Sequence, residues 1–264
     1  MAPGSGSLST DAPAQTGLAQ TGPGSGMPAR LRPPGRHSRG RPIPVLTLLI
    51  CLICLPELVL LLADYGLIGS PRWRLLAYQY GAFWAGLLYG WQPNYTAQPG
   101  LMFLSYGFLH TGPAHLTGNM LGLGWLGARI IDRWGTGRFV WLYLAAMLGG
   151  AAGFGALTSS PAPMIGASGA VFGLAAAWMV GEWQDRRIRA HKAGHGGWPS
   201  RWSALKPALG LTLVLAGFNL ISWMVQNGQL AWETHLGGFL AGLVAALCLP
   251  QREQASQPAA AKVD

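Results

Sequence analysis

The sequence GASGAVFG, at residues 166–173, places a serine between glycines at the start of a long apolar run. Residues 158–163, which precede it, contain two prolines, and proline lacks a backbone N–H and does not fit a helix interior. We therefore expect Ser168 in the first turn of a helix that continues to about Trp183. This helix would rise about 22 Å, less than a hydrocarbon core of about 30 Å. The pattern predicts a serine submerged at a helix N-terminus.

A packing role is the competing interpretation of this stretch. Gly169 and Gly173 form a Gly-xxx-Gly face, which lets membrane helices approach one another closely. Taken alone, the motif favours packing over chemistry. The choice between packing and chemistry depends on which other residues lie at the same depth in the membrane as Ser168.

Composition and charge distribution place the chain among membrane proteins. Of its 264 residues, 50% are hydrophobic and only 10% are charged, and several apolar runs approach 20 residues. The net charge of +9 sits mainly at the ends of these runs, which is a topology signal and argues against a nucleic-acid partner. The cysteines, Cys51, Cys54 and Cys248, lie inside apolar runs, so we expect neither a disulfide framework nor a metal site.

Six membrane-spanning helices are expected in a single domain over residues 43–250. The predicted spans are about 44–65, 114–131, 139–157, 168–183, 208–225 and 232–249. Residues 66–109 are expected to form short helices in the outer leaflet, and the tails 1–42 and 251–264 are expected to be disordered. The first span contains Glu57, for which structural pairing is preferred to a functional role, although the sequence names no partner.

Lysine and arginine residues predict the orientation. The side expected to hold the N-terminus carries most of them, whereas the opposite side carries only Arg72 and Arg74. The positive-inside rule therefore places both termini in the cytoplasm. We expect a multi-pass membrane protein, with the second, fourth and sixth spans all beginning near the outer surface.

Polar residues near the outer ends of these three spans lie at matched depths. Ser168 and His235 are each 15 residues before the expected inner end of their spans, and Asn119 is 13 residues before its own. All three would lie about 20–22 Å above the inner face. Gly238 and Gly242 follow His235 on the face of its imidazole, so the sixth span can approach the glycine face of the fourth.

This approach would bring His235 to hydrogen-bonding distance of the Ser168 hydroxyl. A neutral imidazole can accept the serine proton and later return it to a leaving amine. Phe172, one turn below Ser168, is placed to pack against the imidazole. The Ser168 N–H and the side chains of His115 and Asn119 are candidate oxyanion donors, near three helix N-termini. No acidic residue is close in sequence, so we predict a Ser–His dyad.

Each polar residue has a simpler explanation when taken alone. A lone intramembrane histidine is often structural or part of a proton path, and a lone asparagine often joins helices. Their coincidence at one depth and on one side favours the dyad. His110 is interpreted instead as a structural or water-holding residue.

From about residue 44 to 250 the chain resembles the rhomboid intramembrane serine proteases. The matching features are His110, His115 and Asn119 at their spacing, GASG at 166–169, and HLGG at 235–238 with Gly242. The resemblance implies a six-helix, all-α membrane bundle with a water-filled cavity open to the outside. It also implies a Ser168–His235 dyad and an oxyanion hole formed by His115, Asn119 and the Ser168 N–H. The supporting residues that we expect around this site are Phe172, His110, Gly166, Gly169 and Gly238.

The function implied by this resemblance is cleavage of transmembrane segments of membrane proteins near their outer ends. The implied partners are transmembrane substrates and the lipid bilayer, and neither a metal nor another cofactor is expected. Phe172 stands where many members have tyrosine, and Leu101 and Met102 stand where many have Trp-Arg. The first departure concerns the stacking of the ring of Phe172 on His235, and the second concerns the first loop.

Two alternatives come from other functional classes. One is a catalytically inactive rhomboid-like protein that binds membrane clients, although such relatives typically lose the nucleophile or the histidine, and this chain keeps both. The other is a small transporter, which would be expected to show broken helices in repeated halves, and no internal repeat is visible. The sequence predicts no particular oligomeric state.

Overall fold

The computed structural model describes residues 44–194, 201–225 and 230–249, and within these residues the chain is helical. One isolated antiparallel bridge, between Phe83 and Met164, is the strand-like pairing among them. The predicted tails at 1–42 and 251–264 lie outside the described residues. The helices are α1 (Pro44–Asp64), α2 (Arg72–Gly81), η1 (Ala85–Leu88), α3 (Gln98–Ser105), η2 (Tyr106–Phe108), α4 (Pro113–Trp134), α5 (Thr136–Leu157), α6 (Ser168–Lys192), α7 (Arg201–Val225) and α8 (Trp232–Leu247).

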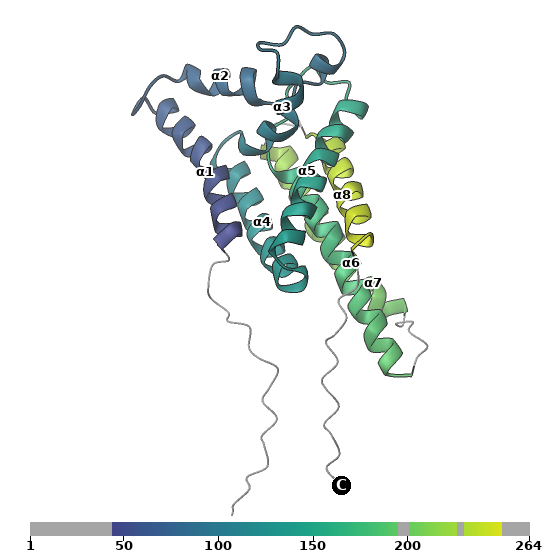
Figure 1. The fold of residues 1–264 in the computed structure, drawn as a ribbon. Helices are drawn as coiled ribbons and strands as arrows, with labels where there is room; N and C mark the ends of the chain where they lie inside the picture. Colours follow the sequence, from purple (N-terminus) through teal and green to yellow (C-terminus); the bar gives the residue numbers. More distant parts are fainter. Residues whose placement is uncertain (1–43, 195–200, 226–229, 250–264) are drawn as a thin grey trace, which may run out of the picture. The chain divides into compact units, whose positions relative to one another are not determined.

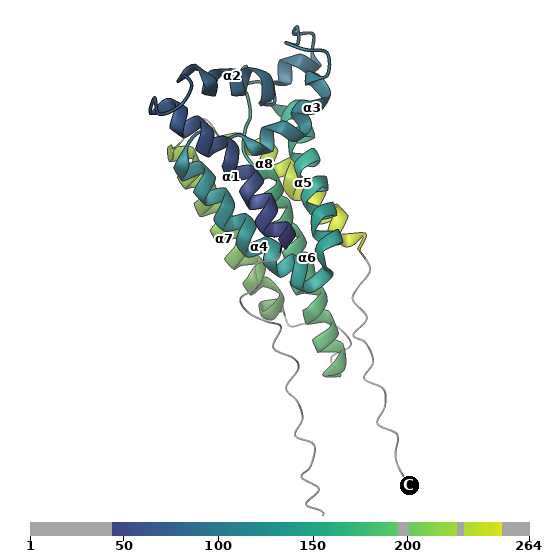
Figure 2. The same cartoon turned by 60° about the vertical axis from the view of Figure 1, so that its left-hand side comes forward.

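Each of the six long helices α1, α4, α5, α6, α7 and α8 overlaps one of the six predicted spans (Figures 1 and 2). The α7 helix begins at Arg201, before the predicted start at about residue 208. By length and composition alone, α1 and α5 each qualify as a membrane span. The other long helices fit this criterion for a membrane span less well. For example, α6 ends in a charged segment, and α8 has only 16 residues. The apolar outer face of α1 fits a lipid environment, since its Leu48, Leu52 and Leu55 are all exposed.

The segment between α1 and α4 forms short helices rather than a span, as the sequence predicts. α2 and α3 lie together beyond the upper ends of α1 and α5 in Figure 1. Backbone hydrogen bonds tie this segment to the loop before α6: Phe83 and Met164 exchange bonds of 3.0 and 2.9 Å, and Gly166 N–H donates to the Tyr106 carbonyl at 2.9 Å. The loop that leads into Ser168 is therefore held in place by backbone hydrogen bonds to the segment between α1 and α4.

The prediction that the helix beginning at Ser168 ends near Trp183 is wrong. α6 continues to Lys192, so its 25 residues rise about 37 Å. The physical reason is local, because residues 184–192 contain neither glycine nor proline, and the first breaker is Gly194 at a φ of +75°. An ion pair between Asp185 and Arg133 of α4 also attaches this extension to the bundle.

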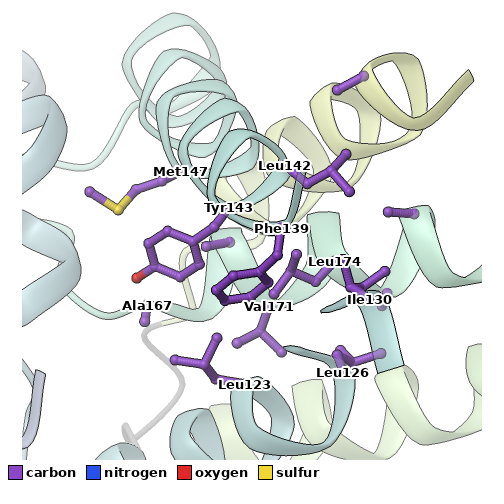
Figure 3. Close-up of a cluster of buried hydrophobic side chains, with 14 of the residues drawn as sticks. Leu123, Leu126, Ile130, Phe139, Leu142, Tyr143, Met147, Ala167, Val171 and Leu174 are labelled. Carbon is purple, nitrogen blue, oxygen red and sulfur yellow. The ribbon is translucent and has the colours of Figure 1, made fainter. Parts of the chain in front are cut away.

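The core is centred on the first half of α6. Every residue from Ser168 to Ala177 is buried, and α6 packs against α4, α5 and α8. Figure 3 shows apolar side chains of three helices meeting there, with Val171 and Leu174 of α6 beside residues of α4 and α5. The labelled neighbours are Leu123, Leu126 and Ile130 of α4, Phe139, Leu142, Tyr143 and Met147 of α5, and Ala167 before α6.

Glycines let α8 approach α6 until their main chains touch. A Cβ on Gly238 would lie 2.7 Å from the carbonyl carbon of Gly169 and closer still to its oxygen. A Cβ on Gly173 would in turn lie 2.6 Å from the Gly238 carbonyl oxygen. Real Cβ atoms do not approach other atoms to under 3.0 Å. The glycine faces identified in the sequence therefore do meet, and they set the separation of α6 and α8.

The buried carboxylate of α1 has a partner that the sequence did not identify. Glu57 is fully buried, and its two oxygens accept hydrogen bonds of 3.0 Å each from the guanidinium of Arg74 on α2. The Nε of Arg74 also contacts a carboxylate oxygen of Asp64 at 2.6 Å. The paired geometry is the favourable one for arginine and a carboxylate, so Arg74 compensates a charge that would otherwise be buried alone.

Candidate active site

Ser168 and His235 lie side by side at the N-terminal ends of their helices, as predicted. Ser168 is the first residue of α6, and His235 lies in the first turn of α8. The Ser168 Oγ and His235 Nε2 are 2.8 Å apart, and both residues are 6% exposed. This is the distance of a good O–H···N hydrogen bond, in a place largely shielded from solvent.

The imidazole of His235 is flanked by an aromatic ring. Phe172 stacks on it with ring centroids 4.2 Å apart and planes within 2° of parallel. Phe172 in turn lies 6.2 Å, between ring centroids, from Phe218 of α7. The predicted contact between Phe172 and the imidazole is therefore present without a phenolic hydroxyl, and it restrains the ring plane.

A third polar residue at the site, Asn219 of α7, was missed by sequence reasoning. Its Oδ1 lies 2.7 Å from Nδ1 of His235, the ring nitrogen that faces away from Ser168. Its Nδ2 donates to the Leu215 carbonyl of its own helix at 3.1 Å. The available signal was an amide inside the apolar run 208–225, at a position that no other predicted site residue pointed to.

His115 and Asn119 of α4 face the turn that leads into Ser168. A Cβ on Gly166 would lie 2.7 Å from Cε1 of His115 and 3.8 Å from Nδ2 of Asn119. At a φ of +114°, Gly166 also adopts a backbone conformation that other residues rarely take. One N–H of Asn119 donates to the His115 carbonyl at 3.0 Å, and its second N–H remains for another acceptor.

The helices α4, α6 and α8 all begin without a side chain that caps their N-terminus by a hydrogen bond. The backbone N–H groups of a first helical turn have no partner within the helix. Together with the helix dipoles, these groups favour negative charge near Ser168 and Asn119. The arrangement can therefore stabilise an oxyanion that develops beside the Ser168 Oγ.

His110 lies beside His115 rather than at the Ser168–His235 pair. The two imidazole rings are 5.0 Å apart between centroids, in an edge-on arrangement. Neither ring nitrogen of His110 has a hydrogen-bond partner among the described residues. Its carbonyl accepts bonds from Arg74 at 3.0 Å and from the Tyr78 hydroxyl at 2.6 Å. Burial raises the pKa of Tyr78, which keeps that hydroxyl protonated as a donor.

A cavity of about 840 Å³ lies next to this site. It is bordered by the segments before α4, α6 and α8, and it reaches His115 and Glu233, which is two residues before His235. Ser168 and His235 themselves are not part of its lining. The cavity offers space for water beside the pair, with polar groups of Thr111 and Ser160 in its wall.

Comparison with known proteins gives matches to one family. Residues 98–252 match the family described as Rhomboid domain, and this segment contains every site residue named above except Arg74 and Tyr78. Rhomboid protease GluP of Bacillus subtilis (strain 168) is 30% identical over 141 residues, which cover 53% of this chain and 24% of that protein. RHOMBOID-like protein 2 of Arabidopsis thaliana is 31% identical over 164 residues, or 62% of this chain and 47% of that protein. The chain thus spans about a quarter and about half of the lengths of these relatives.

Proposed function

This chain belongs to the rhomboid family of integral membrane proteins, and from this premise we propose that it is an intramembrane serine endopeptidase. Its substrates would be transmembrane segments of other membrane proteins, cut near their outer ends. The observation that carries the proposal is the 2.8 Å contact between the Ser168 Oγ and His235 Nε2 at the N-terminus of α6. The name of the Bacillus subtilis relative, a rhomboid protease, agrees with it.

In the proposed acylation step, His235 accepts the proton of the Ser168 hydroxyl as the oxygen attacks the scissile carbonyl carbon. The carbonyl oxygen becomes an oxyanion, which the Ser168 N–H, the free N–H of Asn119 and the imidazole of His115 stabilise. The imidazolium then gives its proton to the leaving amine as the C–N bond breaks. An acyl-enzyme ester on Ser168 and a free amine fragment are the products.

Deacylation repeats these steps with water as the nucleophile. Water from the adjacent cavity loses a proton to His235 as it adds to the ester carbonyl, and Ser168 regains a proton as it leaves. Neither a metal nor another cofactor is required. We expect cuts after small residues and before helix-destabilising ones, because the substrate helix must unwind for its backbone to reach the serine.

A fluorophosphonate probe and a cleavable transmembrane substrate test this proposal together. We expect the wild-type protein to react with the probe and to cleave, and Ser168→Ala and His235→Ala to do neither while still folding. Ser160→Ala is the matched control, because it removes a hydroxyl from the cavity wall next to the site. A folded wild-type protein that neither reacts nor cleaves would contradict the proposal and favour an inactive family member that binds membrane clients.

The proposed location is a bacterial inner membrane with both termini in the cytoplasm. The orientation is supported by the lysine and arginine asymmetry, because the loops before α6 and α8 contain neither residue. In this orientation the Ser168–His235 pair lies toward the outer surface. The division into a membrane domain at 43–250 and two cytoplasmic tails is proposed on the same grounds.

A further inference from the structure

The ring nitrogen of His235 that faces away from Ser168 is hydrogen-bonded as closely as the one that faces it. Nε2 lies 2.8 Å from the Ser168 Oγ, and Nδ1 lies 2.7 Å from Oδ1 of Asn219. The imidazole is thus held between α6 and α7 along its own plane, while Phe172 covers its face. A ring fixed in three directions has a defined orientation.

The orientation of the Asn219 amide follows from its second hydrogen bond. The Leu215 carbonyl can only accept, so the amide nitrogen must face it, at 3.1 Å. The amide oxygen therefore faces His235, and this oxygen can also only accept. Nδ1 of His235 must then carry the proton, which leaves the lone pair of the neutral ring on Nε2, directed at the Ser168 hydroxyl.

We propose that Asn219 is a positioning residue that fixes the tautomer and orientation of His235, so that the site is a Ser–His–Asn arrangement. This inference rests on the proposed function, in which Nε2 must be the basic nitrogen. When His235 takes the serine proton, both ring nitrogens carry hydrogen, and Oδ1 of Asn219 keeps its bond to Nδ1–H without accepting that proton. A neutral amide can serve this role, as it does in Cys–His–Asn proteases.

If Asn219 had a purely structural role, its substitution would have different effects. An amide that only joins α7 to its neighbours would affect thermal stability, and activity per folded molecule would be preserved. It would also leave the protonation pattern of the imidazole unchanged. Measurements of thermal stability, of kcat and of the tautomer of His235 therefore distinguish a structural role of Asn219 from a positioning role.

The test uses Asn219→Leu, which removes the acceptor at similar volume, and Asn219→Asp, which keeps an oxygen in place. Asn219→Ala is a second acceptor-free variant in case the leucine disturbs folding. The packing control is Leu211→Ala, a buried residue of the same helix with no polar contact to His235. The full chain is measured in detergent for kcat, KM, melting and the nitrogen-15 NMR signals of histidine.

We expect the acceptor-free variants to lose about 10- to 100-fold in kcat with KM nearly unchanged, as for a lost buried hydrogen bond. Their His235 signals should shift toward the tautomer protonated on Nε2, and Asn219→Asp should restore most of the activity. Leu211→Ala should lower the melting temperature and leave the tautomer unchanged.

Three results would overturn the assignment: wild-type kcat in the acceptor-free variants, an unchanged tautomer in them, or no rescue by Asn219→Asp. Failure of the proposed function is a separate outcome. It would appear as a wild-type protein that neither cleaves nor reacts with the probe, and the NMR measurement would still decide on Asn219.

Discussion

A single methyl group at Gly238 should move Ser168 and His235 apart. Gly238 follows His235 by three residues on α8, and its Cβ would lie 2.7 Å from the carbonyl carbon of Gly169, where ordinary contact begins at 3.4 Å. Both sides of this contact are backbone, so no side chain can rotate away. The Gly169 carbonyl oxygen is closer still, so in Gly238→Ala the α8 helix must retreat from α6 by more than about 0.7 Å. The separation of the Ser168 Oγ and His235 Nε2 would grow from 2.8 Å to beyond about 3.5 Å, the outer limit of a hydrogen bond.

We expect this displacement to lower kcat by about 10- to 100-fold, because misplacement by about 1 Å typically costs 10²-fold. Overpacking should also lower the free energy of unfolding by about 1–3 kcal/mol. Initial cleavage rates and melting are measured on the same detergent preparation. Gly210→Ala is the matched control, because Gly210 lies in α7 with nothing within 4 Å of its Cβ position. That substitution should stabilise the helix by up to about 1 kcal/mol and leave activity intact. A folded Gly238→Ala protein that cleaves at the wild-type rate would refute the reasoning.

Three further predictions concern other parts of the molecule. Asn119→Ala should lower kcat by up to about 10²–10³-fold with KM nearly unchanged, and a loss of thermal stability alone would remove Asn119 from the site. Arg74→Met should lower the free energy of unfolding by about 3–5 kcal/mol, because Glu57 would stay buried without its partner. Melting of that variant and of the Glu57→Met, Arg74→Met double variant tests this, and a single variant as stable as wild type would contradict it. A reporter that is active only outside the cytoplasm, fused after Asp264, should stay silent, and a strong signal would reverse the proposed orientation.

The six long helices could be predicted because their signals are local. Apolar runs, prolines and glycines mark them, and the glycine spacing on α6 and α8 also indicates which faces meet. The contact between Ser168 and His235 follows from those faces. The predicted end of α6 was wrong because a charged segment marks a membrane boundary without ending a helix. The helix ends only just before Gly194, which has a positive φ.

Pairings between distant polar residues could not be predicted in the same way. Arg74 is 17 residues from Glu57, and Asn219 is 16 residues from His235, with a chain reversal between the members of each pair. Which face of a helix turns inward is weakly specified when the helix is apolar all round, as α1 and most of α7 are. The rotation of these helices, and hence the partners of Glu57 and His235, emerged only from the packed structure.

The main-chain contact between α6 and α8 has a consequence for engineering this protein. The separation of Ser168 and His235 is set on one side of α8, by Gly238 and Gly242 against α6. The opposite side of the helix carries the exposed aliphatic side chains of Leu236, Leu240, Val244 and Leu247. The exposed side can therefore be substituted to suit a thinner bilayer, a different detergent or a soluble scaffold while the spacing of Ser168 and His235 is retained.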